Sequence, residues 1–283
     1  MSTKEVISEV VAQTLDAAKG NPDMRLAGVA AGKSVRVLAE TVRTALLPFA
    51  ALNFGVRKFE EYIRTKFADE LDEALDGVAS ENLQEPPLHV AGPVMQGLAY
   101  TYESEELRRL YLSLLATSMD SSRDDDAHPA FADVIRQLAP REAQYLEAFL
   151  PQNGYVACVQ VRHGTEEKFT ILHPHLLQVR VDGEPDRHPS LPVYVTNWER
   201  LGLIALSFDM QLTDTARYRW GETRPEYLEA VEAFADDSVT HDNGGEEEKV
   251  YLRYGLLMPT SWGRAFSNAV RMGDVEAVPE TAV

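Results

Sequence analysis

The sequence predicts an α+β protein in which a mainly helical N-terminal and central region is followed by a winged-helix-like C-terminal domain. Apolar residues recur at helical spacing as far as residue 150, which predicts helices. Beyond Pro151, short runs rich in valine, isoleucine and aromatic residues predict strands. We therefore expect three parts: amphipathic N-terminal helices in residues 1–84, a central helical block in residues 85–139, and the winged-helix-like domain in residues 140–283.

The N-terminal part is predicted to be helical and amphipathic. Its longest uncharged stretch, residues 44–56, contains Leu46 and Leu47 and is too short to cross a membrane, because a spanning helix needs about 20 apolar residues. We interpret it as a buried helix pair bent at Pro48 or, alternatively, as a segment that meets a membrane or a second subunit on activation. Residues 59–75 predict one charged helix whose narrow apolar stripe suits a bundle or a second copy. The stripe consists of Phe59, Ile63, Phe67 and Leu71.

The central block carries the clearest helix signals. Pro93 is expected in the first turn of one helix, where its missing N–H costs no hydrogen bond. Ser104 is expected to cap the next helix, and Pro140 to open a later one. Residues 120–126 interrupt the helical pattern with polar and charged side chains and therefore predict a loop.

The C-terminal part is predicted to contain strands separated by turns. We interpret residues 163–164 and His173–Pro174 as turns, and we expect residues 217–220 to pair with a neighbouring strand. The runs expected to form strands are residues 155–161, 169–172, 177–181, 203–210 and 250–258.

Helices are expected among these strands. Residues 192–201 form the first, with Trp198 on its apolar side and Gly202 in the position that follows the last helical residue. Residues 225–235 form the second, and Thr260 caps the third. The order of helix, two-stranded ribbon and closing helix is that of a winged-helix module.

The charge of the chain argues against nucleic-acid binding. Asp and Glu total 45 against 27 Lys and Arg, which gives a formal net charge of −18. Affinity for nucleic acid comes mostly from basic side chains that neutralise phosphates. The helix at residues 192–201, which would read DNA in a winged-helix protein, has only Glu199 and Arg200 as charged residues. A DNA-binding regulator is therefore kept only as an alternative.

No cofactor or metal is expected. His173 and His175 flank a proline, with His188 downstream, but a metal site needs a third ligand at a fixed distance. The single cysteine, Cys158, excludes an intrachain disulfide, and its apolar neighbours predict a small core residue. The first 20 residues lack the basic and apolar regions of a secretory signal, so we expect a cytoplasmic protein.

Catalytic residues remain unassigned. A metal-dependent nuclease would need Asp120 and Asp124 to converge with His128 on one cation, but this loop lacks the alternating carboxylates and the glycine of a calcium loop. Glu105 and Glu106 could form an acid/base pair, although their place at the positive end of a helix dipole already explains them.

Three stretches of the chain together resemble a known family. They read SEELRRLYLSLLATSMD from residue 104, HPAFADVIRQLAPREAQYL from residue 128 and NWERLGLI from residue 197. Their combination resembles the Abi-alpha family, over about residues 85–204. The family's name implies abortive infection, a bacterial defence in which an infected cell stops growing before phage matures. The resemblance brings no catalytic residues with it.

These observations favour a non-enzymatic defence protein of the abortive-infection or toxin–antitoxin type. We expect it to bind a protein partner or a phage component and to form a homo-oligomer through its N-terminal helices. The alternatives are a membrane-disrupting effector that uses residues 44–56, a metal-dependent nuclease, and a winged-helix regulator. The candidate interaction residues are Leu46, Leu47, Phe59, Ile63, Phe67, Leu71 and Trp198.

Overall fold

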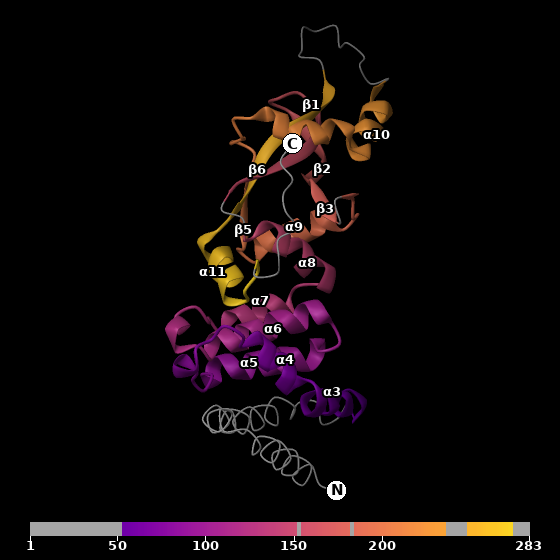
Figure 1. Cartoon of the computed structure of the whole chain (residues 1–283). Coiled ribbons are helices and arrows are strands. Elements are labelled where there is room, and N and C mark those ends of the chain that lie inside the picture. The colour runs from indigo at the N-terminus through magenta and orange to yellow at the C-terminus, as the bar shows by residue number, and fades with distance from the viewer. Residues whose placement is uncertain (1–52, 152–153, 182–183, 236–247, 274–283) are drawn as a thin grey trace. The chain divides into compact units, whose positions relative to one another are not determined.

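The computed structural model describes residues 53–151, 154–181, 184–235 and 248–273 (Figure 1). It contains both helices and strands, as the α+β prediction requires. The chain divides into two compact units. The helical unit comprises the described residues as far as Gln144 and again from Ala265, and the sheet unit comprises Tyr145–Arg264. Leu46 and Leu47, which were expected to be buried or to meet a membrane or a second subunit, lie outside the described residues.

The helical unit is built around α6 (Glu105–Ser118). Every residue from 110 to 118 is buried, and α6 contacts α4, α5 and α7 (Figure 1). A helix buried on all sides lies at the centre of a core. The surrounding elements are α3 (Asn53–Thr65), α4 (Phe67–Ala74), the 3₁₀ turn η3 (Ser80–Asn82), α5 (Leu88–Thr101), the 3₁₀ turn η4 (Ser121–Arg123), α7 (Ala130–Arg136), the first part of α8 (Pro140–Phe149) and the last part of α11 (Ser261–Ala269).

Two predicted helix starts in this unit had different outcomes. Ser104 caps α6, because its Oγ accepts a hydrogen bond from the Leu107 N–H at 3.4 Å. The prediction for Pro93 is wrong, since α5 begins at Leu88 and Pro93 lies inside it. Val90 and Ala91, which precede the proline, are 1% and 0% exposed. Their burial offsets the backbone hydrogen bond that Pro93 cannot donate.

The prediction of a single helix for residues 59–75 is also wrong, because the chain forms two helices here, α3 and α4, which are separated at Lys66. Lys66 leaves helical geometry with φ −129° and ψ −34°. The break allows Tyr62 to meet the Phe67 ring edge-on at 6.2 Å and to donate from its hydroxyl to Glu70 at 2.8 Å. Contacts between the two helices thus replace the continuous stripe that the periodicity suggested.

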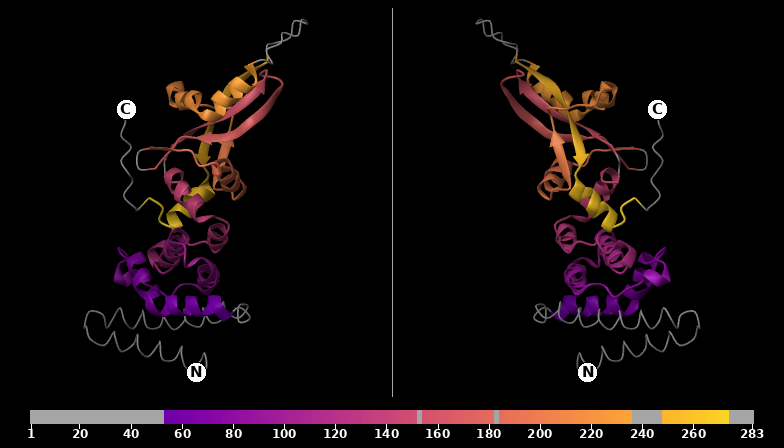
Figure 2. Two further views of the ribbon diagram at one scale, coloured as in Figure 1. Left: turned by 90° about the vertical axis from the view of Figure 1, so that its right-hand side faces the viewer. Right: turned by 90° about the vertical axis from the view of Figure 1, so that its left-hand side faces the viewer.

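The sheet unit contains a four-stranded antiparallel sheet in the order β2-β1-β6-β5 and a separate pair of short strands, β3 and β4. One face of the larger sheet is covered by the 3₁₀ helix η5 (Thr215–Thr223) and α10 (Pro225–Ala233), whereas α9 (Leu191–Arg200) contacts β2 and β5 (Figure 2). The strands are β1 (Val156–Gly164), β2 (Phe169–Leu177), β3 (Val179–Val181), β4 (Glu184–Asp186), β5 (Ile204–Ser207) and β6 (Lys249–Pro259).

The core of this unit lies between the sheet and η5 with α10. Val159 and Val161 of β1 pack there with Tyr218 and Ala230, all of them buried. The Tyr218 hydroxyl accepts from the Leu212 N–H at 2.8 Å and donates to the Gly255 carbonyl at 3.0 Å. Its aromatic ring therefore fills the core while its polar end ties η5 to β6.

Two turn and strand predictions in this unit are corrected. His173–Pro174 is not a turn but lies within β2, and proline is tolerated there because β2 is at the edge of the sheet. Residues 217–220 form part of η5 rather than a strand. Asp214 caps that helix by accepting from the Ala216 N–H at 3.0 Å.

Two residues were correctly predicted to mark the end of one helix and the start of another. Gly202 follows α9 with φ +72°, a conformation that glycine adopts without strain. The Thr260 hydroxyl accepts from the Gly263 N–H at 2.9 Å and so caps α11.

Candidate functional site

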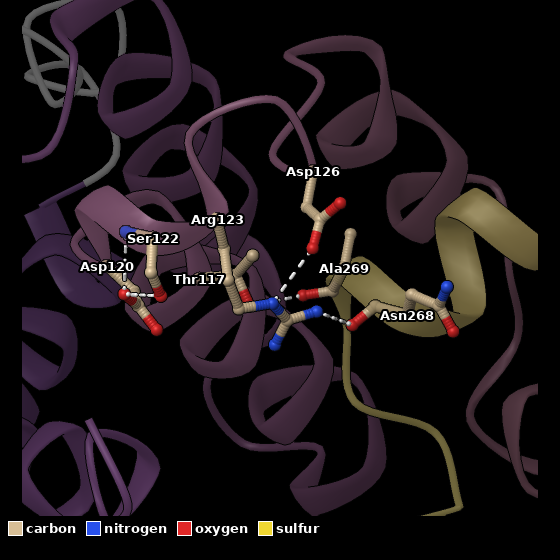
Figure 3. Close-up of polar contacts among 7 residues, drawn as sticks. All are labelled: Thr117, Asp120, Ser122, Arg123, Asp126, Asn268 and Ala269. Carbon is tan, nitrogen blue, oxygen red and sulfur yellow. Dashed lines mark hydrogen bonds and ion pairs between the residues drawn. The ribbon is translucent and has the colours of Figure 1, made fainter. Parts of the chain in front are cut away.

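The acidic loop at residues 120–128 contains Asp120, Asp124 and His128, which a metal-dependent nuclease would need, and each of these side chains has its own hydrogen-bond partner. Asp120 is buried, and its Oδ1 accepts from the Ser122 N–H at 3.0 Å and the Ser122 hydroxyl at 2.6 Å (Figure 3). Asp124 accepts from the Gln84 side chain. The Nδ1 of His128 accepts from the backbone N–H two residues later at 3.1 Å. These hydrogen bonds stabilise the loop, and the three side chains do not form a group that could hold a metal ion.

The same loop holds the end of α11. Arg123 donates from Nε to Asp126 at 2.8 Å and from Nη2 to the Asn268 carbonyl at 2.9 Å (Figure 3). Thr117 of α6 donates from its hydroxyl to the Ala269 carbonyl at 2.8 Å. Carbonyls in the last turn of a helix have no partner within the helix, so these two donors satisfy them. We call Thr117, Arg123, Asn268 and Ala269 the C-terminal clasp.

The chain after α11 adds a further contact to this region. The backbone of Arg271 has φ 53°, a left-handed conformation that is uncommon for residues other than glycine and asparagine. The Met272 N–H donates to the Ser267 carbonyl at 2.9 Å, which closes the end of the helix. Arg271 also donates from Nη1 to the Ala74 carbonyl at 2.5 Å. The clasp and Arg271 therefore join α11 to both α6 and α4.

Glu105 and Glu106 are not arranged as an acid/base pair. Glu106 accepts from the Ser104 hydroxyl at 2.9 Å and from the Gln144 amide at 2.8 Å, whereas Glu105 is exposed. Their positions agree with the interpretation that they stabilise the start of α6.

The histidines considered as metal ligands occupy different surroundings. His188 accepts at Nδ1 from the Ser190 N–H at 3.2 Å and stacks on Tyr194 at 5.7 Å. His175 is half-buried next to Phe208, and burial lowers the pKa of its imidazole. Within the described ranges, no three His, Cys, Asp or Glu side chains are grouped so that they could hold a metal ion.

Cys158 lies in the middle of the sheet, where it pairs with Leu177 of β2 and Gly255 of β6. Its side chain is fully buried, as expected for a small core residue. Burial raises the pKa of the thiol to about 12, so the thiol remains protonated at neutral pH.

Several predicted interaction residues are part of the core of their own unit. In the helical unit Phe59, Phe67 and Leu71 are buried, and only Ile63 is half-buried. In the sheet unit Trp198 is fully buried, 5.7 Å from the ring of Phe149. Their role in binding a partner stays a prediction.

The structure shows an exposed apolar pair that the periodicity alone did not distinguish from core. Leu228 and Val231 of α10 are 52% and 41% exposed, although their neighbour Ala230 is buried. In the sequence they belong to the same apolar face as Tyr227 and Phe234, so only the packing of α10 on the sheet separates them. The two residues are three positions apart and therefore adjacent on the helix surface.

A comparison with protein families identifies the chain. The family model described as abortive infection alpha matches residues 59–270, which is most of the sequence. The chain belongs to the abortive infection alpha family. The match extends beyond residues 85–204, where the resemblance was visible, and includes the whole clasp. No curated protein and no solved structure matches the chain. Among the described helices of this family member, none has the length and apolar character needed to cross a membrane.

Proposed function

We propose that this member of the abortive infection alpha family is a bacterial phage-defence protein that acts in the cytoplasm by binding another protein. The family match over residues 59–270 supports the role in abortive infection. The exposed pair Leu228 and Val231 supports the binding of protein, because adjacent apolar side chains that the unit's own core does not use favour contact with a partner.

The pair is presented on a firmly held helix. α10 contacts β1, β6 and η5, and Ala230 packs into the core on the side facing the sheet. At the start of the helix, Arg224 bonds to both carboxylate oxygens of Glu226. Rigid presentation lowers the entropy lost on binding. Covering the exposed half of each side chain would contribute about 1 kcal/mol per residue.

We propose that α9, β5, β6 and α11 form a winged-helix-like arrangement that binds protein rather than DNA, since Glu199 and Arg200 are the only charged residues of α9. We further propose a toxin–antitoxin-type relationship in which the partner restrains or triggers this chain.

Self-assembly is proposed through the N-terminal helices, where Leu46, Leu47 and the half-buried Ile63 would contribute. Sedimentation of the full chain tests this directly. The wild-type chain is expected to sediment as an oligomer, and the double variant Leu46→Asp with Leu47→Asp as a smaller species. Identical sedimentation of the two proteins would contradict self-assembly through this segment.

The binding role is tested by phage challenge of bacteria that express the chain. Replacing Leu228 and Val231 together by serine is expected to abolish protection while leaving the fold unchanged by circular dichroism. Met210→Ser is a matched control, because Met210 is 50% exposed in the same unit and lies after the end of β5, outside the elements proposed to bind protein. Full protection by the double variant, or equal loss in the control, would contradict a binding role for α10.

A further inference from the structure

The sheet carries a buried arginine on the face opposite α10. Val159 and Val161 face η5 and α10, and side chains alternate along a strand, so Gln160 and Arg162 lie on the other face. Arg162 is only 9% exposed. Its Nε and Nη2 both donate to the Gln160 side-chain oxygen, at 2.9 and 2.6 Å. A guanidinium has five N–H donors, and these two contacts use two of them.

Within the described part of the chain, Arg162 forms no ion pair with a carboxylate. Arg253, which pairs with Gln160 across the strands, lies 3.6 Å from a carboxylate oxygen of Glu166. Carboxylates are abundant, since Asp and Glu outnumber Lys and Arg by 45 to 27. A buried positive charge without a negative partner is costly, and a guanidinium fits a carboxylate through two parallel hydrogen bonds.

The guanidinium extends towards the edge of the sheet. Its Cζ lies 3.9 Å from the centre of the Phe169 ring and 6.0 Å from that of Phe208. Phe169 belongs to β2 and is 39% exposed, and Ile171, which pairs with Arg162, is 44% exposed. The charge of Arg162 is thus next to apolar side chains that remain open to solvent on β2.

β2 is one of the two edge strands of the sheet (Figures 1 and 2). In the described structure residues 169–171 and residue 173 pair with β1 on one side, with an irregularity of the register at Leu172, and their other side has no backbone partner. Pro174 limits further pairing, because proline has no N–H to donate. Residues 169–171 therefore offer a regular strand edge to another chain, and His173 continues this edge beyond the irregularity.

We propose that the outer edge of β2 at residues 169–173 binds an extended acidic segment of a partner protein, and that a carboxylate of this segment binds Arg162. Backbone hydrogen bonds to β2 supply the pairing, as in other strand-addition complexes. Alternate side chains of the added strand lie on the Arg162 face, where one carboxylate reaches the guanidinium above Phe169. Ile171 pairs with Arg162 and so lies on the same face, where the methylene groups of the acidic side chains cover it.

This inference rests on the proposed protein-binding function but uses a different surface from α10. Val159 and Val161 face α10, whereas Arg162 is on the opposite side of β1. Loss of phage protection in the α10 variant therefore tests the proposed function alone, and a peptide-binding measurement on purified protein tests the β2 edge alone.

The probe is a fluorescein-labelled heptapeptide in which glutamate alternates with valine and threonine. Its binding to the full chain is followed by fluorescence polarisation. The same peptide with lysine in place of glutamate tests the charge, and a version with alternate backbone nitrogens methylated tests strand pairing without altering the protein. We expect binding of the first peptide only.

Arg162→Gln is expected to weaken binding of the glutamate peptide by about tenfold or more. Arg136→Gln is the matched control, because it removes an equal charge from the surface of the helical unit. The proposal is overturned if the lysine or methylated peptide binds as well as the glutamate peptide, or if both variants behave alike. No binding of the glutamate peptide up to about 1 mM also overturns it.

Discussion

Arg123 donates a hydrogen bond from Nη2 to the Asn268 carbonyl at 2.9 Å, which joins two residues 145 positions apart in the sequence. Beside it, Thr117 bonds to Ala269 across 152 positions. The acidic loop and α6 thus together hold the end of α11 within the helical unit.

Replacing Arg123 by glutamine is expected to loosen the end of α11. The loss of a charge-assisted hydrogen bond at a partly exposed site costs about 1–2 kcal/mol. Amide hydrogen exchange in residues 265–269 should then accelerate about tenfold. Arg136→Gln, which removes an exposed ion pair with Asp133, should leave this exchange unchanged. Equal acceleration in both variants would contradict the clasp.

Thr117→Val is expected to lower the free energy of unfolding by about 1–3 kcal/mol, because it leaves the buried Ala269 carbonyl without its donor. Thr117→Ser keeps the hydroxyl and should retain most of the stability. Urea unfolding followed by circular dichroism measures both. A valine variant as stable as the wild type would show that this hydrogen bond does not stabilise the fold.

Replacing each of two glycines of α5 by alanine should change the stability of the protein in opposite directions. A Cβ on Gly97 would lie 2.1 Å from the Tyr111 hydroxyl, which is itself bonded to the Ala132 carbonyl. We expect Gly97→Ala to destabilise the protein by about 1–3 kcal/mol. Gly92 has no atom within 4 Å of the corresponding position, so Gly92→Ala should stabilise the helix by up to about 1 kcal/mol. Thermal unfolding that ranked the two variants in the opposite order would refute this packing.

Cys158 should be unreactive in the folded protein. Because burial raises the pKa of its thiol from the usual 9.0 to about 12, almost no thiolate is present at neutral pH. We expect negligible labelling by a maleimide until denaturant is added. Rapid labelling of the native protein would contradict the burial of this residue.

The raised pKa of Cys158 also makes the free energy of unfolding depend on pH in the alkaline range. Below about pH 9 the thiol is protonated in both states, so it has no effect. Between pH 9 and 12 the unfolded chain releases the proton while the folded chain retains it, and stability therefore falls. The Cys158→Ala variant should lose less stability over this range than the wild type. Parallel pH profiles would exclude a contribution from the thiol.

Local signals predicted the ends of several elements. Ser104, Gly202 and Thr260 act through hydrogen bonds or backbone conformations within a few residues of themselves, so their neighbours in sequence suffice to recognise them. The predictions at Pro93 and Pro174 were wrong. Pro93 is tolerated inside α5 because the helical turn before it is buried, and Pro174 is tolerated inside β2 because this strand lies at the edge of the sheet.

The contacts that form the candidate sites were harder to predict from the sequence than the ends of helices. Thr117 and Arg123 meet residues about 150 positions away, and no local pattern identifies such a partner. Arg162 could have been noticed, because Val159, Gln160, Val161 and Arg162 alternate apolar and polar side chains. Its lack of a carboxylate within the described structure, however, depends on the strand register, which the sequence alone did not establish.

The most direct test of the proposed defence role is a one-step growth experiment with phage at high multiplicity. Phage yield and survival of the infected cells are measured in bacteria with and without this chain. Abortive infection predicts that the chain lowers phage yield while the infected cells fail to form colonies. An unchanged yield, or a lower yield from cells that survive, would contradict the account.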